Sequence, residues 1–248
     1  MITVTGPKIL FNIPILGGIP ITQTLLSSWV VMIVVMLAAW ILTRNITKRP
    51  SRKQVIVEKL VTMLYDMVEQ TMGKHNLNFA PYIGTLFISS ILGTLIGMTQ
   101  VFRSTTADLS TTAAWAIATT VLVWYYTIKN DGFFKWLKSF TEPIFIMTPM
   151  NIISEVANPV SMAFRHFGNI AGGSVLTALI YAALAGLSSV VLGWIPNEVI
   201  SSIPIFQLGI PAFLSIYFDL FSGFVQALVF CMLTMVFVGG ANPAPEDK

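Results

Sequence analysis

The chain has 248 residues, of which 55% are hydrophobic and only 10% are charged, and its mean hydropathy is +0.77. Soluble domains usually carry about 25% charged residues, so this composition excludes a soluble globular protein and predicts an integral membrane protein. The net charge of +3 comes from basic residues in short loops between apolar segments, not from one basic face, so we expect no nucleic-acid partner.

Five apolar segments follow one another along the chain. A hydrocarbon core of about 30 Å requires roughly 20 apolar residues of helix. The last two segments exceed this length, which predicts a steep tilt or an extension beyond the hydrocarbon. We therefore predict an all-α integral membrane protein. It forms one membrane domain over residues 1–248, and its last two helices form a long, tilted antiparallel hairpin. The five predicted membrane helices are residues 24–43, 80–102, 111–128, 144–187 and 202–238.

Residues 51–75, between the first two membrane segments, predict a different kind of helix. Val55, Leu60 and Met63 fall near one helical face, whereas Glu58 and most of the other charged residues fall elsewhere. This pattern is typical of an amphipathic helix that lies at the membrane surface.

The basic residues predict how the chain is oriented. Most of them lie in the connection after the first membrane segment and in the connection after the third, and cytoplasmic loops are enriched in Lys and Arg. The N-terminus, with an outer segment over residues 1–23, is therefore predicted to lie outside, and the C-terminus in the cytoplasm. The fourth segment then runs from inside to outside, and the fifth returns.

Four ionisable residues fall at membrane depth. Glu155, Arg165 and His166 belong to the fourth segment, and Asp219 belongs to the fifth. Because an intramembrane charge is costly, such residues usually mark an ion pathway or a ligand site. The alternative for Arg165 is a buried ion pair that holds two helices together.

Small and polar residues line one face of each of these two segments. In the fourth segment, Ser161, Arg165, Gly168, Asn169 and Gly172 recur at spacings of three and four residues. The two glycines alternatively form a G-x-x-x-G pair that lets another helix approach. Two facing polar stripes, one with a cation and one with an anion, predict a water-filled crevice. The stripe on the fifth segment consists of Asp219, Ser222, Gly223 and Gln226.

At these residues the chain resembles a known family. SMAFRHFGNIAGG (161–173) resembles the arginine motif of the a subunit of F-type ATP synthases, in which S-x-x-x-R-x-F-G-N precedes small residues. TADLSTT (106–112) resembles the A-D-x-x-x-T before a membrane helix of that family, and FVQALVFCMLTMVFV (224–238) resembles its glutamine-bearing last helix. The order of segments also matches from about residue 24 to the end.

The resemblance implies a stationary subunit in the cell membrane of a bacterium. Its partners would be membrane lipids, the b-subunit peripheral stalk, the remainder of the complex and the rotating c-subunit ring, whose subunits each carry a carboxylate at mid-membrane. An arginine stays charged at any physiological pH, so Arg165 would attract a passing ring carboxylate and separate two half-channels. Protons, or sodium ions in some relatives, would enter one half-channel and leave by the other.

The resemblance also implies roles for neighbouring residues. Ser161, Gly168 and Gly172 would face the ring. Asn169 and Gln226 match the asparagine and glutamine that the family places near the arginine, and both are neutral groups that can bond water or the guanidinium. Simple hydrogen bonding between helices is the alternative for this pair.

One pair of positions departs from a common family pattern. Many relatives carry a glutamate nine residues after the arginine and a histidine in the last helix, whereas this chain has Ser174 and Asp219 there. With Gln226 level with Arg165, Asp219 would lie about 10 Å and Ser174 about 13 Å toward the outside. We therefore expect these two residues in the outer half-channel.

The sequence also predicts roles for three further polar residues. Glu155, about 15 Å to the inside of Arg165, is a candidate for the inner half-channel, and an interfacial carboxylate is its alternative. His166 points about 100° away from Arg165, which favours packing over proton relay. Asp108 is expected to cap the helix that follows it.

The competing interpretation is a self-contained ion channel or secondary transporter. Such proteins typically show inverted repeats and broken helices in corresponding halves, whereas the polar residues here gather in the last two segments. A purely anchoring scaffold would leave Arg165 and Asp219 without a role. The sequence lacks G-x-x-x-x-G-K-[ST], so we expect no ATP hydrolysis by this chain alone. We also expect no metal and no cofactor, and translocation of ions instead of chemistry on this chain.

Overall fold

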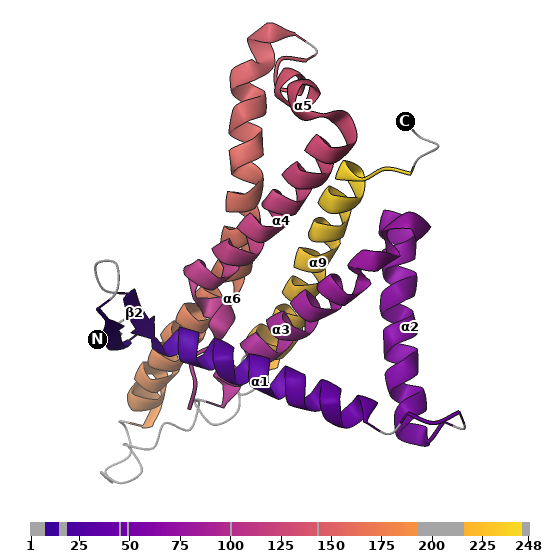
Figure 1. Cartoon of the computed structure of the whole chain (residues 1–248). Helices are drawn as coiled ribbons and strands as arrows, with labels where there is room; N and C mark the ends of the chain where they lie inside the picture. Colours follow the sequence, from indigo (N-terminus) through magenta and orange to yellow (C-terminus); the bar gives the residue numbers. More distant parts are fainter. Residues whose placement is uncertain are drawn as a thin grey trace.

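A computed structural model describes residues 8–14, 19–44, 46–48, 50–99, 101–142, 144–192 and 216–244 of the chain (Figure 1). Within these ranges the fold is helical, as predicted, apart from one antiparallel pair of strands. These are β1 (Ile9–Ile13) and β2 (Ile19–Thr22), with Ile9 opposite Thr22. The sequence analysis did not anticipate this hairpin in the N-terminal segment.

Helix α1 (Gln23–Thr43) begins directly after β2 and corresponds to the first predicted membrane helix. The Thr22 hydroxyl caps it by accepting a hydrogen bond from the Leu25 amide at 3.4 Å. Its buried side chains include Thr24 and Ser27, whereas Trp40 and most of its other large apolar side chains are exposed. This is the reverse of a soluble helix, and it is expected where the surroundings are hydrocarbon and small residues mediate helix contacts.

Helix α2 (Arg52–Met72) is the predicted amphipathic helix. It begins after Ser51, which caps the Gln54 amide, and it ends at Gly73, whose φ of 82° terminates the helix. The C-terminal part of α2 packs against α3 and α9, and its buried side chains are Val68 and Met72. Figure 1 shows α2 running at a steep angle to α1.

The remaining elements form a bundle in which α3 packs against α9, and α4 packs against α6 and α9 (Figure 1). Its largest buried side chains include Ile83, Phe230 and Met235. The elements are η1 (Lys74–Phe79), α3 (Ala80–Met98), η2 (Thr105–Ala107), α4 (Leu109–Asp131), α5 (Phe133–Ser139), η3 (Phe145–Met147), α6 (Thr148–Leu192), the π-helical η5 (Ile216–Phe221) and α9 (Ser222–Ala241).

Four helical segments in the described part of the chain are long and apolar enough to cross a membrane. The predicted segment 111–128 is helical within α4, but it is not among the four. Of the predicted segment 144–187, residues 148–187 belong to one helix, α6, which continues through Pro159, and Phe145–Met147 form the short helix η3 before it. Residues 202–215 of the last predicted segment lie outside the described residues. The four are Gln23–Thr43, Lys74–Met98, Phe145–Val191 and Ser222–Ala241.

Gly223 lets α9 lie directly on α3. A Cβ atom at this position would stand 2.7 Å from Cγ2 of Thr94, closer than real side chains approach. The close packing of α9 on α3 therefore requires a glycine at position 223.

The C-terminal end of α9 is held by an amide cluster that we call the asparagine clamp: Asn76, Asn130 and Asn242. The Asn242 amide donates to Oδ1 of Asn76 at 2.6 Å, and the Asn130 amide donates to Oδ1 of Asn242 at 2.9 Å. Asn76, which is 1% exposed, also donates to the carbonyl oxygens of Met72 and Asn242. The clamp thus ties α9 to the end of α2 and to α4.

Replacing Asn76 by Ala should lower the free energy of unfolding by about 1–3 kcal/mol, because it leaves the Asn242 amide without its acceptor in a buried site. Reversible unfolding of the purified chain in detergent measures this change. Asn78→Ala is the matched control, since Asn78 is exposed two residues away, and it should change stability by less than about 0.5 kcal/mol. Equal stability of the two variants would show that the clamp contributes nothing.

Candidate functional site

Helix α6 has one buried face and one open face around Arg165. Met162, His166 and Ile170 are buried at 4%, 0% and 7% exposure. Each residue advances about 100° around a helix, so Arg165 lies about a quarter turn from His166, and its side chain is exposed. The other exposed residues on the side of Arg165 include the three that were predicted to face the ring, Ser161, Gly168 and Gly172.

Within the described part of the chain, nothing packs on the open face at its glycines. A Cβ atom added at Gly168 or at Gly172 would meet nothing within 4 Å. The G-x-x-x-G pair therefore does not serve the approach of another described helix of this chain. Among the side chains that the structure describes, Arg165 takes part in no ion pair; the ion pairs found there are Lys74–Glu69, Lys135–Asp131 and Lys138–Glu142.

Asn169 and Gln226 lie where α6 meets α9. The Ser222 hydroxyl donates to Oδ1 of Asn169 at 2.9 Å, and the rings of His166 and Phe230 are 5.3 Å apart. Gln226 lies one helical turn from both Ser222 and Phe230, between the residues of α9 that contact Asn169 and His166. Its side chain is only 6% exposed.

The second polar stripe is divided in the structure. Ser222 faces α6, whereas Gly223 faces Thr94 of α3. Asp219 belongs by its backbone to the π-helical η5, and its side chain lies outside what the structure describes. Ser174 is exposed, and its hydroxyl donates to the Ala171 carbonyl at 2.7 Å.

His166 is a packing residue, as the sequence predicted. Its Nε2 lies 3.0 Å from the Ser90 hydroxyl of α3. Its ring also makes edge contacts with Trp115 of α4, at 5.9 Å between centroids, and with Phe230 of α9. No hydrogen-bond partner for Nδ1 is found within the described part of the chain.

Glu155 lines a small cleft between α4, α6 and α9. The cleft measures about 190 Å³, and Asn158, Thr119 and Thr120 also line it. The Trp124 indole N–H donates a hydrogen bond to Oε1 of Glu155. Glu155 is therefore partly enclosed instead of freely exposed.

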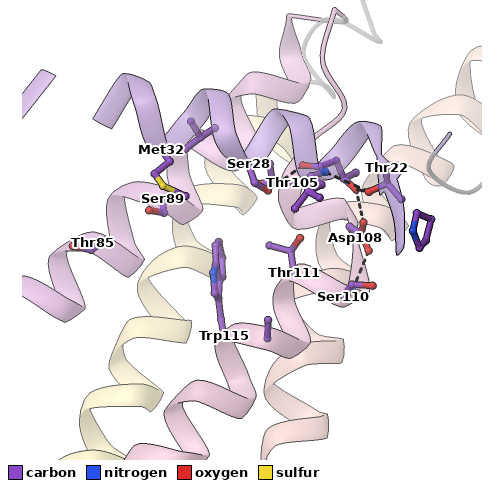
Figure 2. A pocket seen from close by; sticks show the side chains of 15 residues that line it. Thr22, Ser28, Met32, Thr85, Ser89, Thr105, Asp108, Ser110, Thr111 and Trp115 are labelled. Carbon is purple, nitrogen blue, oxygen red and sulfur yellow. Dashed lines mark hydrogen bonds between the residues drawn. The ribbon is translucent and has the colours of Figure 1, made fainter. Parts of the chain in front are cut away.

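A larger cavity of about 690 Å³ lies between α1, α3 and α4 (Figure 2), and we call it the hydroxyl cavity. Asp108 and Trp115 both line it, and Figure 2 shows Asp108 beside Ser110. Asp108 caps α4 as expected, accepting from the Ser110 amide at 3.0 Å, and it also accepts from the Thr24 hydroxyl of α1. The lining hydroxyls belong to Thr22, Thr24, Ser28, Thr85, Ser89, Thr105, Ser110 and Thr111.

The sequence analysis missed the hydroxyl cavity, although the sequence holds a signal for it. Thr24 and Ser28 are four residues apart on α1, and Thr85 and Ser89 are four residues apart on α3. Each pair marks one polar helical face. Which helices bring these faces together depends on tertiary packing. Among the described residues, no group of three or more His, Cys, Asp or Glu side chains is placed to hold a metal ion.

Known proteins match the chain along almost its whole length. A family model described as ATP synthase A chain matches residues 25–239. The chain is 35% identical to ATP synthase subunit a 1 of Crocosphaera subtropica, over 93% of this chain and 91% of that protein. It is 33% identical to ATP synthase subunit a of Legionella pneumophila, over 94% and 92% of the two chains. It is 32% identical to the sodium ion specific ATP synthase subunit a of Propionigenium modestum, over 96% and 86%.

These matches confirm the resemblance that the arginine motif carried. The matched residues contain α6 with its open face, helices α3 and α4 of the hydroxyl cavity, and α9 up to Gly239. Together with the apolar helices they indicate a multi-pass protein of a bacterial membrane. The chain therefore belongs to the ATP synthase A chain family and serves in the membrane sector of an F-type ATP synthase, with the rest of that complex as its partner.

Proposed function

We propose that this chain provides two ion half-channels against a rotating c-subunit ring and that Arg165 separates them. The observation that carries the proposal is the open face of α6, where an exposed Arg165 stands among glycines that contact nothing else in the described chain. A charge in hydrocarbon is costly, so this face requires a polar or charged partner. A ring carboxylate supplies that partner, and the small residues permit close approach without locking the ring.

The hydroxyl cavity is the proposed access on the outer side. It extends from Asp108, near the start of α4, to Trp115 two turns further along that helix, and hydroxyl groups line it. Water and small cations are well solvated by such oxygens. Asp219 and Ser174 complete the outer half-channel nearer to the ring. The π-helical backbone around Asp219 supports this assignment, because π segments are frequent at functional sites.

The cleft at Glu155 is the proposed inner half-channel. Glu155 lies ten residues before Arg165 on α6, which corresponds to about 15 Å along the helix. The cleft also contains polar atoms of Asn158, Thr119 and Thr120. Arg165 thus lies between an inner and an outer polar region and blocks direct passage between them.

The proposed arrangement in the membrane has five crossing helices, α1, α3, α4, α6 and α9. The helices α6 and α9 form a long, tilted antiparallel pair, which the Asn169–Ser222 and His166–Phe230 contacts support. Helix α2 lies at the cytoplasmic surface, the N-terminus outside and the C-terminus inside. A peripheral stalk of b subunits holds the chain against the ring.

The proposed coupling ion is the proton, with sodium as the alternative. Hydroxyl groups and one carboxylate line the cavity, and these groups suit either ion. The Propionigenium modestum relative is named as sodium ion specific, so transport assays on this chain need both ions.

Replacing Arg165 by Gln should reduce ion-driven ATP synthesis at least tenfold while the complex still assembles, because a neutral side chain no longer ionises the ring carboxylate or blocks leakage. Synthesis in reconstituted vesicles, normalised to assembled complex, measures this. Arg44→Gln is the control, since the Arg44 guanidinium lies over the Trp40 ring at the end of α1. Near-normal synthesis by Arg165→Gln would rule out the separator role and favour a self-contained channel or transporter.

Asp219→Asn should slow transport strongly, because Ser174 supplies no carboxylate in the outer half-channel. Adding Ser174→Glu to the same chain should then recover part of the rate. Asp131→Asn is the control, since Asp131 pairs with Lys135 at an exposed helix end. Ion-driven ATP synthesis per assembled complex distinguishes a relay role of Asp219 from a structural one. Full activity in Asp219→Asn excludes the relay. Impaired assembly without rescue by Ser174→Glu indicates a structural role.

The open face of α6 should contact the ring. Cysteines introduced at Ser161 or Gly172 should form disulfides, under mild oxidation, with cysteines placed near the ring carboxylate. Ala163→Cys is the control, because Ala163 is 4% exposed on the buried face and should give at least tenfold less product. If the open-face cysteines crosslink only within this chain, the proposed ring contact is wrong.

A further inference from the structure

We propose that His166 is a positioning residue: it fixes the rotation of α6 about its own axis and thereby keeps Arg165 on the open face. This inference rests on the proposed role of Arg165 for its functional meaning. The rotational effect itself is a property of the fold and can be measured without any transport.

His166 contacts three helices at once. Its Nε2 is 3.0 Å from the Ser90 hydroxyl of α3, and its ring makes edge contacts with Trp115 of α4 and Phe230 of α9. The side chain is 0% exposed. These contacts fix both the position and the plane of the imidazole, whereas an aliphatic side chain of similar size fills space without a directional bond.

His166 also lies in the middle of the buried face of α6. Met162 and Ile170, one turn to either side, are buried with it, and Gly173 shares the same side. Of the three large side chains in this row, only His166 has a polar group to bond across the helix interface. A rotation of α6 therefore has to break the Ser90 bond and both ring contacts.

Arg165 is sensitive to such a rotation. A helix with its side chains has a radius of about 5–6 Å, so turning it by about 20° moves a side-chain tip by about 2 Å. A misplacement of about 1 Å can cost a factor of about 100 in a reaction that depends on orientation. The residue next to Arg165 in sequence thus controls where its guanidinium stands.

The contacts of His166 favour positioning over proton relay. Ser90, Trp115 and Phe230 are uncharged, and the two aromatic rings enclose the imidazole. A glutamine has an amide that can bond the Ser90 hydroxyl but does not titrate in the physiological range. His166→Gln therefore separates the two roles, and His166→Leu removes both.

The first measurement reads the rotation directly. In a full-length chain whose single cysteine is removed by Cys231→Ala, a cysteine is introduced either at Gly168 on the open face or at Ala163 on the buried face. The ratio of their rates of modification by N-ethylmaleimide should be high in this background. The ratio should fall at least fivefold with His166→Leu and stay within twofold with His166→Gln. His75→Leu, which alters the other histidine at the far end of the bundle, is the control and should leave the ratio unchanged. An unchanged ratio in His166→Leu would overturn the inference.

The second measurement uses the assembled complex. Ion-driven ATP synthesis should fall at least tenfold in His166→Leu and stay above half in His166→Gln, with the same dependence on pH as the parent. Ser90→Ala should act in the same direction and add little to His166→Leu, because both remove one bond. Loss of synthesis in His166→Gln with an unchanged modification ratio would assign a relay role instead. Retained ATP synthesis in Arg165→Gln would refute the proposed function. The modification ratios at Gly168 and Ala163 would still test whether His166 fixes the rotation of α6.

Discussion

The structure depends on one constraint, namely that hydrocarbon cannot hydrogen-bond to polar groups. Hydroxyl side chains in the helices satisfy this constraint within their own helix, because each donates a hydrogen bond to a carbonyl oxygen one turn earlier. Thr85 bonds the Pro81 carbonyl, and Thr119 and Thr120 bond those of Trp115 and Ala116. Hydroxyls of different elements also pair with one another, as Thr94 of α3 does with Thr106 of η2 at 2.9 Å. Polarity is thus gathered inside the bundle, and the apolar side chains face outward.

The open face of α6 departs from this arrangement in an informative way. A charged side chain stands there among glycines, on a face that no described helix of the chain covers. The same helix is fixed on its other side by a bonded histidine between two aromatic rings. A helix that is held in place on one side, with a charged face that no described residue covers, supports the proposal that its counterpart belongs to another chain.

Several features followed from the sequence because they depend on local chemistry. The cap at Asp108 and the amphipathic character of α2 are of this kind. The open face around Arg165 follows from helical periodicity alone. The burial of His166 follows from its angular distance to Arg165, since one face of a helix in a bundle has to pack.

Other features depend on pairings between distant segments. The β1–β2 hairpin was missed because its strands are short, five and four residues, and lie in a segment without clear alternation. The hydroxyl cavity requires α1, α3 and α4 to meet, and the asparagine clamp joins residues 166 positions apart. Helix α6 also continues through Pro159. A proline inside a helix removes one backbone bond, and packing of the surrounding helix compensates for it.

Trp115 belongs to two structures at once. One part of this side chain lines the hydroxyl cavity, and its ring contacts both His166 and Phe230. A change at Trp115 therefore alters the shape of the hydroxyl cavity and the packing of α6 at the same time. In related chains, a smaller residue at this position would enlarge the cavity and loosen the imidazole together, so residues equivalent to Ser90, Trp115, His166 and Phe230 should vary as a group during evolution.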